Sequence, residues 1–245
     1  RLGLWEKAYE AYEYAIIINP DYTQVLHNMA QICRQQEKIE KAIELWTQKM
    51  EGSEEDPITL SLIGNAYLDI DEFDKAGHAF QRSVDLDPDW SESWYGLGYC
   101  MDAKGDISES IKYFEKAIDC DPEVDIYWFA IADEYHKANR LDESIFSYER
   151  AIELQPEDAL YYLELASVYS EQKEVRKALD VIMNGIKVLP ENDDFKLVAG
   201  ALHLCLNDTE AAIGEWEQME DPVPNMDAIY TAVPEMAHDD FLISY

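Results

Sequence analysis

The chain has 245 residues, of which 52 are Asp or Glu and 19 are Lys or Arg, so its formal net charge is −33. A surface this negative repels the phosphates of nucleic acids and of anionic membranes, so we expect neither as a partner. Hydrophobic residues make up 47% of the sequence, more than a disordered polymer carries, and no apolar run approaches the roughly 20 residues of a membrane-spanning helix. We therefore expect a folded chain without membrane insertion.

The sequence matches itself at a period of 34 residues, without any insertion. A fixed period of this length predicts an array of structural repeats. In chain order we expect a half repeat at 1–22, then repeats at 23–56, 57–90, 91–124, 125–158, 159–192 and 193–226. Arg1 falls at the thirteenth position of a repeat, so we interpret the chain as a piece of a longer protein that begins near the end of a first helix.

Small and large residues recur at set positions of the repeat. The eighth position holds only Ala or Gly, namely Ala30, Gly64, Gly98, Ala132, Ala166 and Gly200. The twenty-fourth position holds a bulky residue, namely Tyr12, Trp46, Phe80, Phe114, Tyr148, Ile182 and Trp216. Small residues let two paired helices approach closely, and a bulky residue fills the space beside them.

Each repeat is predicted to form two short amphipathic helices joined by a turn. The apolar residues of the third repeat fall on two helical faces, Trp94, Leu97 and Met101, then Ile107, Ile111 and Phe114. Gly105 lies between them and suits the left-handed backbone that often ends a helix. Asn139 and Asn207, at the equivalent position, can adopt it too.

The segment 227–245 follows the last repeat and does not continue the pattern. Asp227 can cap a helix start, but Pro234 occupies the eighth position, where it breaks or kinks a helix. The apolar residues Phe241, Leu242 and Ile243 need cover. We expect a capping segment folded onto the sixth repeat, and docking into another molecule's groove, as in self-assembly, is the alternative.

The pattern resembles the tetratricopeptide repeat (TPR) family. The residues that carry the resemblance best are Trp94, Leu97, Gly98, Ser110, Phe114, Ala117 and Pro122, then Trp128, Ile131, Ala132, Tyr135, Ser144, Tyr148, Ala151 and Pro156. It implies an all-α fold, a right-handed superhelical solenoid of 34-residue helix-turn-helix repeats over 1–226. Lys196, His203 and Met219 depart from the pattern in the last repeat, as terminal repeats often do.

The resemblance also implies where a partner binds. In this family the first helices line a concave groove, and positions 2, 5, 9, 12 and 13 face it. Carried onto this sequence, the central groove positions are Asn65, Asp69, Glu92, Tyr95, Tyr99, Asp102, Phe129, Asp133 and His136. This acidic and aromatic lining suits a peptide segment with Lys or Arg beside apolar side chains. Alternatively, the aromatic residues only cover the inner helix faces.

No motif indicates catalysis, a cofactor or a metal site. The five histidines contain no pair at helical ligand spacing, and no H-E-x-x-H, Walker or G-x-S-x-G sequence occurs. Cys33, Cys100, Cys120 and Cys205 form no C-x-x-C pair, which argues against zinc and favours a reducing, cytoplasmic location. The Lys and Arg residues with which related proteins hold the carboxylate end of heat-shock chaperones are missing from the equivalent positions.

These observations predict a non-enzymatic scaffold that binds a protein or peptide partner, with basic residues in the bound segment. A partner-selecting arm of a larger multidomain enzyme and a self-assembly module remain open, as does the oligomeric state. The acidity itself has two explanations: attraction of a basic partner, or only the solubility of an elongated, exposed array.

Overall fold

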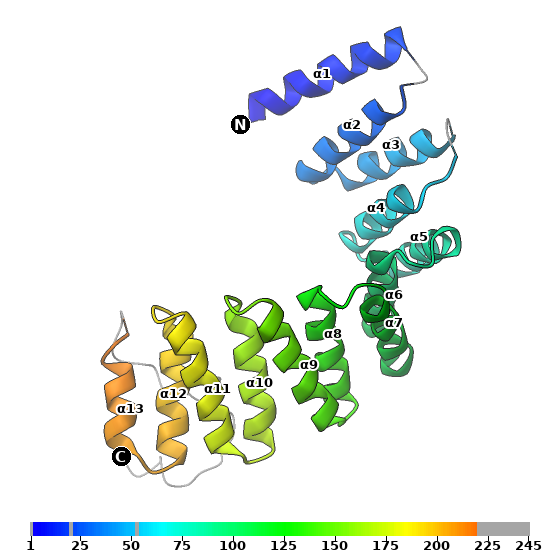
Figure 1. Ribbon diagram of the computed structural model, residues 1–245. Coiled ribbons are helices and arrows are strands. Elements are labelled where there is room, and N and C mark those ends of the chain that lie inside the picture. Colours follow the sequence, from blue (N-terminus) through cyan, green and yellow to red (C-terminus); the bar gives the residue numbers. More distant parts are fainter. Residues whose placement is uncertain (1, 20–21, 52–53, 220–245) are drawn as a thin grey trace. The chain divides into compact units, whose positions relative to one another are not determined.

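The computed structural model describes residues 2–19, 22–51 and 54–219. Across these ranges the chain forms thirteen α-helices and no strand, which confirms the predicted all-α solenoid of helix-turn-helix repeats (Figure 1). The chain packs into two compact units, Arg1–Pro122 and Glu123–Tyr245. The boundary between the units falls two residues before the fourth repeat.

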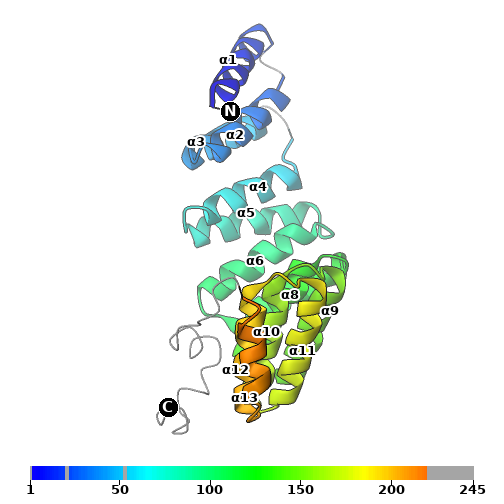
Figure 2. The same ribbon diagram turned by 90° about the vertical axis from the view of Figure 1, so that its left-hand side faces the viewer.

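The first unit holds seven helices among its described residues: α1 (Leu2–Ile18), α2 (Gln24–Gln35), α3 (Ile39–Glu51), α4 (Pro57–Leu68), α5 (Phe73–Leu86), α6 (Ser91–Ala103) and α7 (Ile107–Cys120). After α1 the helices pack as the pairs α2 with α3, α4 with α5, and α6 with α7 (Figure 2). α1 runs unbroken from Leu2, so the expected end of a preceding first helix is not seen there.

The second unit holds six helices in its described part: α8 (Asp125–Lys137), α9 (Leu141–Leu154), α10 (Ala159–Glu171), α11 (Val175–Val188), α12 (Asp193–Cys205) and α13 (Thr209–Trp216). They pack as the pairs α8 with α9, α10 with α11, and α12 with α13. Local signals explain where several helices of the protein begin. Asn192, for example, accepts a hydrogen bond from the Phe195 amide at 2.9 Å and so caps the start of α12.

A left-handed residue ends the first helix of every pair. It recurs at the fifteenth position of each repeat, as Glu37, Asp71, Gly105, Asn139, Lys173 and Asn207, with φ between 57° and 76°. This confirms the conformation expected at Gly105, Asn139 and Asn207. At the other three positions the tertiary structure imposes the same turn on residues that favour it less.

The small eighth position and the large twenty-fourth position pack directly together. A Cβ atom built on Gly98 would lie 2.5 Å from Cδ1 of Phe114, and one built on Gly64 would lie 2.6 Å from Cε1 of Phe80. A Cβ atom built on Gly200 would collide with Nε1 of Trp216 in the same way. Since real Cβ contacts are longer than 3 Å, these glycines are required by the close approach of the two helices, as the sequence predicted.

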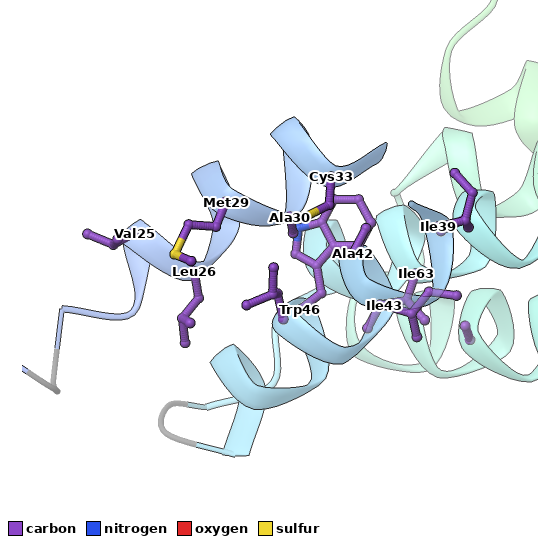
Figure 3. Close-up of a cluster of buried hydrophobic side chains, with 13 residues drawn as sticks. Val25, Leu26, Met29, Ala30, Cys33, Ile39, Ala42, Ile43, Trp46 and Ile63 are labelled. Atoms are coloured by element: carbon purple, nitrogen blue, oxygen red, sulfur yellow. The ribbon is translucent and has the colours of Figure 1, made fainter. Parts of the chain in front are cut away.

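The same packing builds the core of each unit. In the first unit, one cluster joins Val25, Met29 and Ala30 of α2, the fully buried Trp46 of α3 and Ile63 of α4 (Figure 3). A core assembled from successive pairs has no single centre, so each repeat depends on its neighbours for burial.

In the last repeat, a lysine that departs from the family pattern makes polar contacts within the protein. Lys196, at a position usually aromatic, is 6% exposed. Its Nζ donates to Oδ1 of Asp193 at 2.9 Å and to the carbonyl oxygen of Gln218 at 3.0 Å. The ammonium group therefore ties the start of α12 to the chain after α13. The capping segment predicted at 227–245 lies outside the described residues.

Candidate partner-binding surface

The predicted groove residues lie on the first helices of their repeats, except Asp69, which directly follows α4. We call the surface formed by these helices in each unit its first-helix face: α2, α4 and α6 form it in the first unit, and α8, α10 and α12 in the second. Glu92, Tyr95, Tyr99 and Asp102 recur on α6 at spacings of three and four residues, so they share one side of that helix. Each unit presents its own part of the predicted set.

The tyrosines of α6 differ in how far they are available to a partner. Tyr99 is 45% exposed, which is unusual for so large a side chain. Tyr95 is half-buried, because its ring packs against Phe114 of α7 at a centroid distance of 5.5 Å. Tyr99 is thus the more accessible aromatic contact on this face of the first unit, while Tyr95 also supports the helix pair.

The acidic residue that directly follows α4 is already compensated within the protein. Both carboxylate oxygens of Asp69 accept from the guanidinium group of Arg34 on α2, at 2.6 Å and 3.1 Å. Such a bidentate pair joins two successive first helices across the face. Asn65, one turn earlier on α4, is half-buried. The α4 part of the face is therefore less negative than its sequence suggests.

In the second unit, three predicted residues follow one side of α8. Phe129, Asp133 and His136 are separated by four and three residues, so they lie in a row along the helix. The ring of Phe129 stacks on that of Tyr161 from α10 at 4.9 Å, and it meets Tyr148 of α9 edge-on at 5.8 Å. Phe129 thereby covers two buried tyrosines while remaining partly accessible itself.

Carboxylates from α10 face the acidic residue of α8. Burial, and then the negative charge of Asp133, raise the pKa of Glu164, whereas His136 lowers it. His136 contacts Glu171 through Nε2 and Oε2 at 2.7 Å, which links α8 to α10. Asp133 also pairs with Lys137, one turn along α8, at 3.2 Å. The structure thus gathers acidic groups from two first helices.

A buried hydroxyl group lies behind these carboxylates. Tyr148 is completely buried, and no described residue donates a hydrogen bond to its hydroxyl oxygen. Burial raises the pKa of this phenol most, and the charges of Asp133 and Glu164 and a hydrogen bond to Asp133 raise it further. These causes place the hydroxyl group close to both carboxylates. We call Phe129, Asp133, His136, Tyr148, Tyr161, Glu164 and Glu171 the acidic-aromatic cluster.

Sequence reasoning missed three members of this cluster as groove residues. Tyr161 and Glu164 hold the third and sixth positions of their repeat, and Tyr148 was interpreted only as a packing residue at the twenty-fourth. One available signal was that Glu164 interrupts the apolar run of α10 between Leu163 and Leu165. A charged residue between apolar neighbours is costly to bury unless something pairs with it.

Two further features of the described chain bear on its chemistry. Within residues 2–19, 22–51 and 54–219 no group of three or more His, Cys, Asp or Glu side chains is arranged to hold a metal ion. Over the same ranges no helix combines the length and the apolar character needed to cross a membrane.

Comparison with known proteins bears out the repeat pattern. Residues 62–125 match the family model described as tetratricopeptide repeat, and residues 132–173 match one described as TPR repeat. No curated protein matches the chain significantly in sequence. The chain therefore contains tetratricopeptide repeats, which confirms the resemblance seen in its sequence.

Solved structures of TPR proteins share the fold. The C-terminal part of a TPR repeat-containing protein from Cytophaga hutchinsonii gives a TM-score of 0.75 at 17% identity, covering 92% of this chain and 93% of that one. A tetratricopeptide repeat protein from Parabacteroides merdae gives 0.63 at 19% identity, covering 96% and 93%.

YrrB, described as a TPR protein with an unusual peptide-binding site, gives a TM-score of 0.63 at 20% identity, covering 78% of this chain and 98% of its own. At these identities the likenesses show the fold, which is typical of protein-interaction scaffolds.

Proposed function

We propose that the protein is a non-enzymatic scaffold that binds extended segments of a partner protein on the first-helix faces of its units. The bound segments carry basic residues beside apolar ones. The observation that carries the proposal is the pairing of accessible aromatic rings with carboxylates on these faces, as at Tyr99 beside Asp102 and at Phe129 beside Asp133.

Two physical effects favour such a partner. A cationic side chain gains from the negative potential of a chain with net charge −33, which also speeds its association at low salt. Aromatic faces add cation-π attraction and apolar contact area. A solubilising charge alone does not require aromatic rings next to the carboxylates.

The cytoplasmic location stays a prediction. It rests on the cysteines, since all four are free thiols.

Selection from a library of random displayed peptides tests the proposal. We expect the selected peptides to be rich in Lys or Arg next to apolar residues. Tyr99→Ala should weaken their binding by about tenfold, as measured by fluorescence anisotropy, because an accessible interface tyrosine carries much contact energy. The loss should occur without a change in helical content or melting temperature.

Tyr14→Ala is the matched control, because Tyr14 is 69% exposed on α1 and lies outside the first-helix face. Its affinity should equal that of the parent protein. Selected peptides without basic residues, or equal losses from the two tyrosine variants, would contradict the proposal.

A further inference from the structure

The acidic-aromatic cluster combines an excess of negative charge with an unused buried hydroxyl group. Glu164 is half-buried, and no hydrogen bond or ion pair to it is found among the described residues. Asp133 has Lys137 as its cation, but Lys137 is shared with the buried Glu134 at 2.7 Å. The permanent cations of the protein therefore leave this cluster undercompensated.

Tyr148 supplies the second, independent observation. Its hydroxyl group is buried behind Phe129 and next to the carboxylates of Asp133 and Glu164, and no described residue donates a hydrogen bond to its oxygen. A buried polar atom with an unused acceptor position is costly, so proteins rarely keep one. The hydroxyl oxygen of Tyr148 keeps such a position beside the two carboxylates.

We propose that the acidic-aromatic cluster binds the guanidinium group of an arginine side chain from the bound segment, with Asp133 and Glu164 accepting its hydrogen bonds and Phe129 covering its planar face. The inference rests on the proposed function, because it names the side chain that the second unit recognises in the partner. Tyr161 and Tyr148 hold the Phe129 ring in place from behind.

Guanidinium fits this site better than ammonium does. It presents five donors in a rigid plane, which matches several acceptors spread over α8, α9 and α10. It is also more weakly hydrated, so it loses less hydration free energy when it enters a partly buried site. Its plane also stacks on an aromatic ring. The His136 contact to Glu171 lies one turn beyond Asp133 and closes the row on that side.

Small cations test the site without any partner. We would titrate the full chain with butylguanidinium and follow the amide and aromatic resonances by NMR, with butylammonium as the comparison ion. We expect saturable shifts at Phe129, Asp133 and Glu164 with butylguanidinium, and an affinity for butylammonium lower by about fivefold or more. No saturable shift there, or equal affinities for the two ions, would overturn the arginine site.

Two variants assign the binding to named groups. Glu164→Gln should weaken butylguanidinium by about fivefold or more, because it removes a charge-assisted acceptor, whereas Glu149→Gln on the exposed side of α9 should not. Tyr148→Phe should weaken it too while changing the melting temperature little, since no described residue donates a hydrogen bond to the lost hydroxyl oxygen. Parent-like affinity in both cluster variants would overturn the proposal.

The selected peptides separate this inference from the proposed function. If butylguanidinium saturates the cluster but peptide binding is insensitive to both Tyr99→Ala and Glu164→Gln, the arginine site stands and the proposed use of the first-helix face fails. If peptides bind through Tyr99 while neither Glu164→Gln nor replacement of their arginines changes the affinity, the arginine site fails and the proposed function stands.

Discussion

The two units share one packing scheme but differ in how their first-helix faces balance charge. In the first unit, Arg34 reaches across from α2 and holds Asp69 with two hydrogen bonds. In the second unit, Lys137 comes from the same helix as Asp133, and Glu164 on the next first helix pairs with no Lys or Arg among the described residues. The comparison shows that packing repeats from unit to unit, whereas the surface chemistry does not.

The shared scheme has a physical reason. Gly98 against Phe114 in the first unit and Ala132 beside Tyr148 in the second satisfy the same close approach of paired helices. Any larger residue at the eighth position would push the pair apart, so this position tolerates little variety. Residues on the first-helix face meet no such limit, and they are therefore free to differ in charge.

The largest expected effect on stability comes from disrupting the close helix packing at the eighth repeat position, which both units share. Gly98→Leu and Ala132→Leu should each lower the free energy of unfolding by about 1–3 kcal/mol or more, because the new side chain overpacks the helix pair. Urea denaturation followed by circular dichroism measures the loss. The control is Gly77→Leu in α5, where a Cβ atom meets nothing within 4 Å.

The control variant should be as stable as the parent or slightly more stable, since leucine favours a helix over glycine. Parent-like unfolding of Gly98→Leu or Ala132→Leu would mean that the eighth position is not the point of closest approach.

Much of the fold could be predicted from the sequence because packing imposes residue types on it. The small eighth residues and the bulky twenty-fourth residues are direct consequences of helix contact, so their period carries the architecture. The turns could be predicted only in part. Gly105 and Asn139 are residue types that indicate a left-handed backbone. Glu37 and Lys173 adopt the same conformation because the packing of the two helices that they connect forces the turn.

The candidate site could be predicted less well, because a repeat position gives a residue's place but not its partners. The pair of Arg34 with Asp69 joins residues 35 positions apart, and whether they meet depends on the angle between successive helices. For the same reason Glu164 was missed, although Asp133 was predicted. The role of these groove residues in binding stays a prediction.

Smaller changes in the free energy of unfolding are expected at equivalent turns of the two units, and they should have opposite signs. Gly105→Ala in the first unit should lower the free energy of unfolding by about 1 kcal/mol, because alanine is strained at a φ of 76°. Lys173→Gly in the second unit should raise it by about 0.5–1 kcal/mol, since glycine relieves the left-handed strain but loses more chain entropy. Equilibrium urea unfolding measures both, and changes of the same sign would contradict this account.

The smallest expected effect contrasts one carboxylate from each unit across pH. Lys104 binds Asp74 of α5 at 2.6 Å and lowers its pKa from 3.8, so this group's contribution to stability is present at neutral pH and is lost as the pH falls through the lowered pKa. Asp74→Asn should therefore lower the melting temperature slightly at about pH 7.

For Glu164 the pH dependence of the contribution to stability has the opposite sign. Burial and Asp133 raise its pKa above 4.5, so folding favours the protonated form, and the resulting stability is present below that value and is lost as the pH rises through the raised pKa. Glu164→Gln should raise the melting temperature slightly at about pH 7 and leave it nearly unchanged at about pH 3, where the parent carboxyl is almost fully protonated in both states. The groups that face Glu164 are Asp133 and His136 on α8 and Tyr148 on α9, with Glu171 on its own helix.

Melting curves of the Asp74→Asn and Glu164→Gln variants and of the parent at both pH values test this contrast between the units. A Glu164→Gln variant that melts below the parent at neutral pH would show that the protein itself compensates this carboxylate, and the contrast between the units would disappear.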